Sequence, residues 1–392
     1  MNRNITKVTF LKSFNQLAIL GYLRRELMSR AELARKIGLS RAAVSLLVEN
    51  LIKQGFLIET GTVLSDTGRR PTLLTLRSEY CYCIGVSIAR DKTGIGIVDF
   101  QGNIVCTKEI QCFGTVCDTL DGLANEIEML LIEYEISSEK LLGIGVNTPG
   151  LVDIVAGKVL EPPNFEKWHN VYIVKELEKR TGYRSFIENY SNSIALAEKH
   201  YGCGEKFDSM MVMTVDSGIG VGIIIQNSLY RGANGFGSEI GHTCIDIHGD
   251  NCACGNRGCL ELYAARPAIL NAARKISLEL DSWSKIVDHA IEGDKDCMDI
   301  ILRQAEYLAV GIVNTMNVLE LDAVVLTGDM VYKPDILLSN LRQRVNEWVM
   351  SRNFRKFPMI TSTLPGHAEI LCAASVVLEK FFCGEIDLVN NV

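Results

Sequence analysis

The sequence has no apolar run approaching the roughly 20 residues needed to cross a bilayer. Its first residues, 1–7, carry some charge but neither the apolar segment nor the cleavage site of a secretory leader. A disulfide framework is also missing: the 13 cysteines are odd in number, and most stand singly in apolar surroundings, as Cys81, Cys83, Cys203 and Cys372 do. These absences predict a cytoplasmic protein with reduced cysteines and no membrane partner.

The composition is that of a globular protein, with 47% apolar and 22% charged residues. A chain of 392 residues is long for one core, so two or three domains are expected. Charge is unevenly distributed along it. Residues 1–79 hold 13 basic and 6 acidic side chains, whereas the rest holds 27 basic and 41 acidic ones. A basic head on an acidic body indicates that the head binds a polyanion.

The basic head has the spacing of a helix-turn-helix. Apolar residues recur at helical intervals from Phe10 to Leu27, and Ser29 with Glu32 forms a capping box that starts a second helix. Gly38 ends that helix, and Ser40 caps a third whose apolar face runs from Val44 to Ile52. Two short helices joined by a tight glycine turn are typical of this motif.

The start of the third helix carries the candidate base-reading residues. Small and basic side chains there let a helix lie in the major groove. Two strands follow, Phe56–Glu59 and Leu73–Leu76, and the arginines between them suit phosphate or a narrow minor groove. A plain three-helix packing module with a solvated basic surface is the alternative. The predicted DNA contacts are Ser40, Arg41, Ala42, Ser45, Arg69 and Arg70.

From Tyr80 onward strands alternate with helices, which predicts an α/β body. Strands are expected at Cys83–Ile88, Gly94–Phe100, Leu142–Val146, Met210–Val215 and Val221–Gln226, with helices at Leu120–Tyr134 and Ile300–Leu319. The glycines at 218, 220 and 222 form a loop between two of these strands. Such a loop suits either phosphate binding by backbone N–H groups or a tight hairpin, and the sequence leaves both open.

The most specific pattern is Cys252-x-Cys254 followed by Cys259, preceded by His242 and His248. Three thiolates and one imidazole make the closed tetrahedral set of a structural zinc site. Either histidine is close enough along the chain to complete it. Glu239 and Glu261 flank the set and are not required by the metal, so their carboxylates are candidates to accept hydrogen bonds from sugar hydroxyls.

In these features the chain resembles the ROK family of repressors, open reading frames and kinases, specifically its repressor branch of xylose and N-acetylglucosamine repressors. The resemblance rests on the helix-turn-helix, the wing motif Gly-Arg-Arg-Pro at 68–71, Pro149-Gly150, Pro163-Asn164, Glu188-Asn189, 235–242 and the cysteine run 252–261. It implies a winged helix-turn-helix followed by a two-lobed, actin-like and sugar-kinase-like (ribonuclease H-like) domain with a zinc loop. The family pattern also favours His242 over His248 as the metal ligand.

The resemblance implies a division into three parts: a DNA-binding domain over 1–79, a first lobe over 80–185 completed by a helix at 370–392, and a second lobe over 186–369 that contains the zinc loop 239–261. It also implies that Asn164, Asn189, Glu239, His242 and Glu261 contact the sugar. Taken alone, Asn189 is as well explained as a turn residue, and Glu261 as a charge at a helix start.

Three departures from the family's kinases predict that phosphoryl transfer is lost. The expected phosphate-gripping hairpin is replaced by Ser87-Ile88-Ala89-Arg90-Asp91, and the expected Asn-Asp pair is Asn189-Tyr190. A tyrosine, with a pKa near ~10, is a poor general base. Thr327-Gly328-Asp329 stands where a glycine pair is usual. No ATP is therefore expected.

The resulting hypothesis is a sugar-responsive transcriptional repressor that binds palindromic operator DNA as a homodimer or homotetramer. Two alternatives remain open. One is a bifunctional ATP-dependent sugar kinase with a DNA-binding head. The other is a regulator whose trigger is a partner protein.

Overall fold

The computed structural model describes residues 14–62, 72–89, 92–111, 115–162, 166–365 and 368–386. Its internal contacts divide the chain into two compact units, Met1–Asn189 together with Gly366–Val392, and Tyr190–Pro365. The first unit holds a small winged module and a five-stranded sheet, and the second holds another five-stranded sheet. The predicted α/β class is confirmed, whereas the three domain boundaries stay a prediction.

The winged module contains the elements that its caps predict. A helix over 14–23 is followed by β1 (Met28–Ser29), α2 (Arg30–Ile37), α3 (Arg41–Lys53), β2 (Leu57–Thr62) and β3 (Thr72–Leu76). Ser29 caps α2, and its backbone N–H donates to the Glu32 carboxylate over 2.8 Å, so the capping box is confirmed. Gly38 ends α2 at φ 75°, the left-handed conformation that glycine adopts without strain.

Apolar burial fixes how α3 is rotated in this module. Val44, Leu47, Val48 and Leu51 are buried, while Ile52 is only half-buried. The three-stranded sheet has the order β1-β3-β2, and both pairings are antiparallel. Phe10 and the wing residues 68–71 lie outside the described residues.

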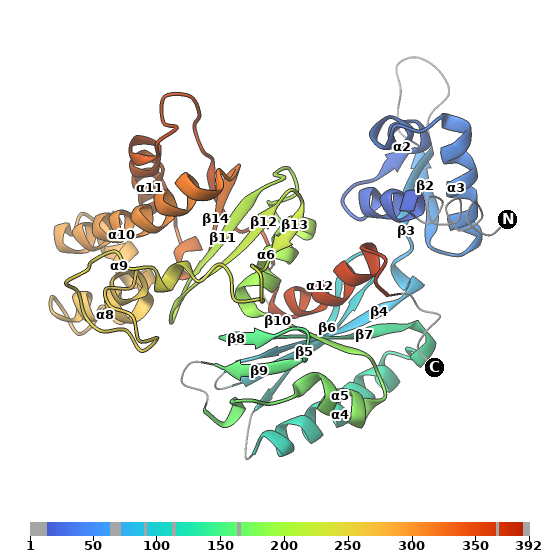
Figure 1. Ribbon diagram of the computed structural model, residues 1–392, viewed down its shortest axis with the longest axis horizontal. Coiled ribbons are helices and arrows are strands. Elements are labelled where there is room, and N and C mark those ends of the chain that lie inside the picture. The colour runs from blue at the N-terminus through green and yellow to red at the C-terminus, as the bar shows by residue number, and fades with distance from the viewer. Residues whose placement is uncertain are drawn as a thin grey trace. The chain divides into compact units, whose positions relative to one another are not determined.

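The sheet of the first unit has the order β10-β7-β4-β5-β6. It contains β4 (Tyr82–Ile88), β5 (Lys92–Asp99), β6 (Ile104–Gln111), β7 (Leu141–Thr148) and β10 (Ser185–Asn189). The first three are antiparallel neighbours, and β7 and β10 run parallel to β4. Helices α4 (Val116–Glu133) and α5 (Ile173–Thr181) cover one face, and α12 (Ala368–Phe382) covers the other (Figure 1). A short hairpin, β8 (Leu151–Asp153) and β9 (Lys158–Glu161), follows β7.

Three glycines let α12 approach the sheet at backbone distance. A Cβ atom on Gly85 would overlap the carbonyl of Ile370, and one on Gly145 would overlap the carbonyl of Ala373. A Cβ on Gly96 would meet the Ile370 side chain and the Cys106 carbonyl. The strands β4, β5 and β7 therefore form a smooth surface on which this distant helix lies.

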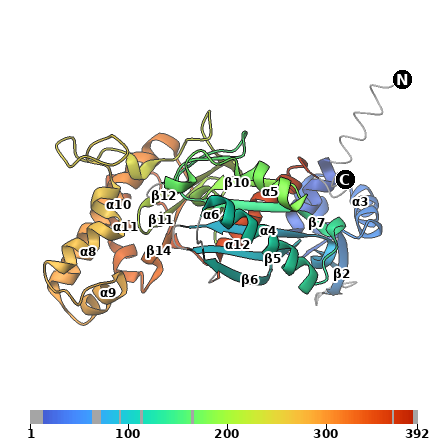
Figure 2. The same cartoon turned by 90° about the horizontal axis from the view of Figure 1, so that it is seen from below.

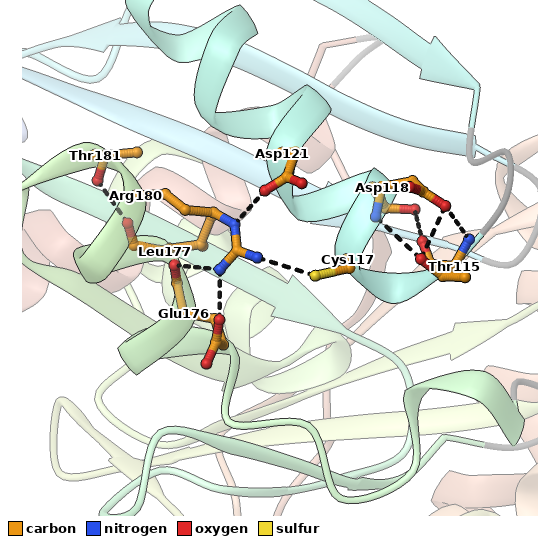
Figure 3. A network of polar contacts seen from close by, with 9 residues as sticks. Thr115, Cys117, Asp118, Asp121, Glu176, Leu177, Arg180 and Thr181 are labelled. Carbon is orange, nitrogen blue, oxygen red and sulfur yellow. Dashed lines mark hydrogen bonds and ion pairs between the residues drawn. The ribbon is translucent and has the colours of Figure 1, made fainter.

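On the opposite face, Arg180 joins α5 to α4. Its guanidinium points across to α4 in Figure 3 and donates to Asp121 over 2.6 Å and to the Cys117 sulfur over 3.2 Å. It also pairs with Glu176 one helical turn earlier. The paired carboxylates raise the pKa of Arg180 further above its usual range, so this cross-link keeps its charge at any ordinary pH.

The winged module contacts the first sheet through a set of side chains that we call the junction: Arg24, Phe56, Tyr80, Phe100, Glu379, Phe381 and Phe382. The Phe100 ring is fully buried and lies 5.3 Å from Tyr80, 5.3 Å from Phe381 and 5.5 Å from Phe382, measured between ring centroids. Phe56, directly after α3, lies 4.1 Å from Tyr80. The rings therefore link the end of α3 to the end of α12.

Ionic and polar contacts reinforce the junction. The Arg24 side chain is 1% exposed, pairs with Glu379 over 3.2 Å and lies 4.4 Å above the Phe382 ring. The Gln101 amide donates to the Leu76 carbonyl of β3 over 2.6 Å. These contacts join the winged module and α12 within one unit.

The sheet of the second unit has the order β13-β12-β11-β14-β15. Its strands are β11 (Met210–Val215), β12 (Ile219–Ile225), β13 (Ser228–Tyr230), β14 (Ala323–Gly328) and β15 (Met359–Thr361). Helix α6 (Tyr190–Tyr201) packs on β11 and β12, and the other helices gather on the opposite side (Figures 1 and 2). These are α7 (Glu261–Ala264), α8 (Arg266–Arg274), α9 (Trp283–Ile291), α10 (Lys295–Leu319) and α11 (Asp335–Trp348).

The glycines at 220 and 222 lie within β12 rather than in a loop, so that part of the sequence interpretation is wrong. They pair with Thr214 and Val212 of β11. A Cβ on Gly220 would overlap Ser191 of α6, and one on Gly222 would overlap the Ser191 carbonyl. These glycines serve helix–sheet packing, and the turn at Asp216–Gly218 is a tight hairpin closed by Asp216 N–H donating to the Gly218 carbonyl over 2.9 Å.

Among the helices that the structure describes, none has both the length and the apolar character to cross a membrane.

Candidate metal centre and DNA-binding surface

Residues 239–261, which we call the metal loop, have little regular structure of their own. A single 3₁₀ turn (Ile240–His242) precedes two isolated bridges, Cys244 with Cys259 and Asn251 with Arg257. A backbone hydrogen bond closes the turn at 252–256, where Cys252 N–H donates to the Asn256 carbonyl over 2.8 Å. Gly255 within this turn has φ 90°, a left-handed conformation. A Cβ on Gly258 would overlap the Asp246 carbonyl, which explains a glycine at this position.

This loop brings His242, Cys252, Cys254 and Cys259 together, with their ligand atoms all within 4.8 Å of one another. Cys252 Sγ lies 3.7 Å from His242 Nδ1, and Cys254 Sγ lies 3.7 Å from Cys259 Sγ. Tetrahedral zinc with ordinary bond lengths places two sulfurs about 3.8 Å apart and a sulfur and a nitrogen about 3.6 Å apart. The donor set and its spacing therefore fit a tetrahedral metal ion.

The Cys259 thiol is the least ready of the three to ionise without a cation. Burial, together with the neighbouring thiols of Cys254 and Cys252, raises the pKa of Cys259 to about 12. His248, the alternative ligand, does not belong to the cluster and is exposed. Its backbone N–H instead donates to Asp246 over 2.9 Å. The geometry favours His242.

The two flanking carboxylates differ in their surroundings. Glu261 begins α7, and its Oε1 lies 3.4 Å from both Cys252 Sγ and His242 Nδ1, so it lies against the ligand set rather than apart from it. Glu239 is exposed as a residue, although the surrounding protein partly desolvates its carboxylate. Desolvation raises the pKa of Glu239 above its ordinary value. The nearby His242 lowers this pKa, and the Glu261 carboxylate raises it further. Both glutamates remain candidates for hydroxyl binding.

The other predicted sugar contacts belong to the first unit. Asn189 ends β10, and its side-chain amide donates to the Gly150 carbonyl over 2.8 Å. Gly150 has φ 80°, so its turn is left-handed. Asn164 lies outside the described residues, as do Arg90 and Asp91. Tyr190, which follows Asn189, is the first residue of α6.

One ionic cluster was not predicted from the sequence. It lies at the carboxyl ends of β11 and β14, where Arg266 pairs with Asp216 over 2.5 Å and with Asp329 over 3.1 Å. Burial raises the pKa of Asp216, against the opposing effect of Arg266. The three residues are far apart in the chain, so no local pattern could reveal the cluster.

The candidate DNA-binding surface is the start of α3. Ser40 caps the helix by accepting from the Ala43 N–H over 3.2 Å. Ser40, Arg41 and Ala42 are exposed, and Ser45 is half-buried on the same side. Arg69 and Arg70 lie outside the described residues.

Comparisons with known families match both parts of the chain. The ROK family profile matches residues 83–380, and a winged helix-turn-helix DNA-binding profile matches residues 15–58. The xylose repressor of Bacillus subtilis is 31% identical over 380 residues, covering 96% of this chain and 98% of that protein. The glucokinase of Thermotoga maritima is 30% identical, but it covers 76% of this chain and 97% of its own length.

A solved structure described as a ROK family transcriptional regulator, homologous to the MLC protein of E. coli, superimposes with a TM-score of 0.80. The aligned region includes 97% of this chain and 98% of the other chain, at 23% sequence identity. At this identity the similarity shows the fold alone. The predicted order of a winged module followed by a sugar-kinase-like domain is confirmed.

Proposed function

This chain belongs to the ROK family, and from that premise we propose that it is a sugar-responsive transcriptional repressor. The observation that carries the proposal is the extent of similarity to xylose repressors. It runs through the winged module and the body together, over 96% of this chain. The similarity to a glucokinase covers 76% of the chain. A repressor needs both a DNA-binding part and a part that binds the effector.

The winged module is proposed to bind double-stranded operator DNA. Its support is the exposed start of α3, where Arg41 and Ala42 follow the Ser40 cap, and the basic charge of residues 1–79. The N-terminal half of such a helix reaches base edges in the major groove. Arg69 and Arg70 are proposed to bind phosphate or the minor groove. A homodimer or homotetramer would present two such modules to a palindrome.

The metal loop is proposed to hold structural zinc through His242, Cys252, Cys254 and Cys259. Zinc supplies a cross-link between the segment that follows Glu239 and the segment that precedes Glu261. The imidazole of His242 then has one nitrogen for the metal and the other for a hydroxyl or a neighbour. Glu239, His242 and Glu261 are proposed to bind a monosaccharide, with Asn164 and Asn189 as further contacts. Xylose is the first sugar to test.

We propose that the chain does not use ATP. Asp216 and Asp329 place two carboxylates and one guanidinium, from Arg266, at the carboxyl ends of β11 and β14. This excess of negative charge disfavours a polyphosphate. Gly220 and Gly222 pack against α6 and are therefore not free to approach a phosphate. Tyr190, the first residue of α6, has no carboxylate that could act as a base. One observation supports the kinase alternative, namely the similarity to a glucokinase.

The junction offers a path between effector and DNA. Helix α12 lies on the first sheet at Gly85 and Gly145, and its end carries Phe381 near Phe56 and Phe382 below Arg24 of the winged module. A sugar that changes the position of α12 therefore changes the position of α3. The sugar must bind one arrangement better than the other for the equilibrium to move.

The deciding experiment uses the full-length, zinc-loaded protein. Duplexes are selected from a random pool, and binding is then measured by fluorescence anisotropy with xylose, glucose or N-acetylglucosamine present. We expect enrichment of a palindrome and release of DNA by one of these sugars or a close relative. Failure to enrich any duplex, with or without sugar, would contradict the proposal. Release of ADP from ATP and one of the same sugars would support the kinase alternative.

A further inference from the structure

We propose that Leu46 reads the operator by contacting the 5-methyl group of a thymine in the major groove. The inference deepens the proposed DNA-binding function and rests on it. Leu46 is 61% exposed and lies on the recognition helix α3, one turn after Ala42. It was not among the residues that the sequence pattern singled out.

The buried face of α3 fixes where Leu46 points. Val44, Leu47, Val48 and Leu51 are buried against the rest of the winged module. At about 100° per residue, the side opposite to that face carries positions 42, 46, 49 and 53. The residues there are Ala42, Leu46, Glu49 and Lys53, and all four are exposed. Leu46 therefore stands near the middle of the outward face.

The surroundings of Leu46 match the chemistry of duplex DNA. Arg41 is exposed at the start of the same helix, and Arg35 and Lys36 are exposed at the end of α2 just before the turn. Arg41 and Arg35 suit the phosphates on either side of a groove, whereas Lys36 pairs with Glu26. The apolar pair Ala42 and Leu46 lies on the outward face of the same helix. The DNA occupant is therefore favoured by charge as well as by position.

Only one group on the major-groove edge of a base pair is apolar, and that group is the thymine methyl. A leucine side chain offers no donor and no acceptor. If Leu46 faced a cytosine amino group or the guanine acceptors, it would displace their water without replacing the hydrogen bonds. Leu46 would thus favour thymine by contact and disfavour the other bases by exclusion of water.

The test uses deoxyuridine, which differs from thymidine only by the missing methyl group. Each thymine of the selected duplex is replaced singly, and the dissociation constant is measured for the full-length protein. At one thymine and its symmetry mate we expect binding to weaken by roughly 4- to 15-fold, the value for burying about one to two methylene equivalents. In the Leu46→Ala variant the same replacement should change binding by less than about twofold.

Two further variants separate a base contact from a folding defect. Leu46→Met keeps an apolar side chain and should keep the methyl dependence. Leu27→Ala removes another exposed leucine of the winged module, 52% exposed and outside α3, and should behave like the unmodified chain. Thermal unfolding of all variants checks that the module stays folded.

The outcomes are distinct. If a duplex is selected but no thymine methyl affects binding, or if Leu46→Ala keeps the full dependence, the inference is overturned while the proposed function stands. If no duplex is selected, the proposed function fails and the inference fails with it.

Discussion

The junction and the metal loop are held by different forces. In the junction, the Phe100 ring and the Arg24 side chain are almost completely buried, and rings from four separate segments surround one another. In the metal loop, the only buried residue between Thr243 and Arg257 is Cys252. The polypeptide itself stabilises the junction by burial of apolar area. The stretch 243–257 lies between the buried Ile240 and Leu260 but has no core of its own, so we expect its order to depend on a bound metal. Each region should therefore fail under a treatment that spares the other.

The largest effect is expected from removing the metal. Structural zinc contributes an apparent ~10–16 kcal/mol in small zinc domains, far more than any single side chain. Cys259→Ser should therefore reduce bound zinc from about one ion per chain to a small fraction and increase hydrogen exchange of backbone amides across 243–260. Metal analysis and hydrogen exchange measure this, while the amides around Phe100 should stay protected.

The control for that experiment is Cys244→Ser. Cys244 is exposed, lies in the same loop, and is not part of the four-residue cluster. It should keep its zinc. Loss of zinc from this variant, or full retention by Cys259→Ser, would contradict the assignment of ligands.

The next effect concerns the core of the junction. Phe100→Ala should lower the free energy of unfolding by about 3–5 kcal/mol, because it leaves a cavity among four neighbouring rings. Urea denaturation measures the change, and zinc content should not respond. The matched control is Phe354→Ala, since Phe354 is 92% exposed and its removal should have almost no effect. Equal losses in the two variants would show that the ring cluster is not a folding determinant.

A somewhat smaller loss is expected from the buried ion pair. Arg24→Met leaves the Glu379 carboxylate, which is 18% exposed, without its cation. Breaking such a pair costs about 3 kcal/mol, the low end for buried pairs because Glu379 keeps some solvent. The double variant Arg24→Met with Glu379→Gln should recover part of that loss in urea denaturation. A double variant no more stable than the single one would rule out the charge as the cause.

The smallest effect belongs to the helix cap. Ser29→Ala removes the side chain that accepts from Glu32 N–H over 3.3 Å and should lower the free energy of unfolding by about 1 kcal/mol. Neither the junction nor the zinc content should change. Thermal unfolding followed by circular dichroism measures this shift, and a loss as large as that of Phe100→Ala would mean that the cap also supports the junction.

The features that were predicted correctly are local in the sequence. The capping box of Ser29 and Glu32 and the left-handed Gly38 depend on residues a few positions apart, and the spacing of Cys252, Cys254 and Cys259 falls within one knuckle. Local geometry decides each of them, so the pattern is sufficient. The choice of His242 over His248 came from the family pattern and agrees with the observed cluster.

The features that were missed depend on contacts between distant segments. Arg24 and Glu379 are 355 positions apart, and Arg266 meets Asp216 and Asp329 only because two strands end side by side. The glycines 220 and 222 were read as a loop because glycine is common in turns, yet close packing against α6 is what requires them. Leu46 is a different case: the predicted apolar face of α3 already implied its exposure, and it was passed over because the prediction favoured small and basic side chains.

The order in which the chain is synthesised gives α12 a further consequence. This helix leaves the ribosome after the entire second unit, yet it covers the sheet whose strands were made first. Until then α12 does not cover the face of β4, β5 and β7 around Gly85 and Gly145, and the winged module lacks its contacts with Phe381 and Phe382. A nascent or prematurely terminated polypeptide that lacks α12 therefore exposes this apolar face, and such exposure makes incompletely folded chains prone to aggregate.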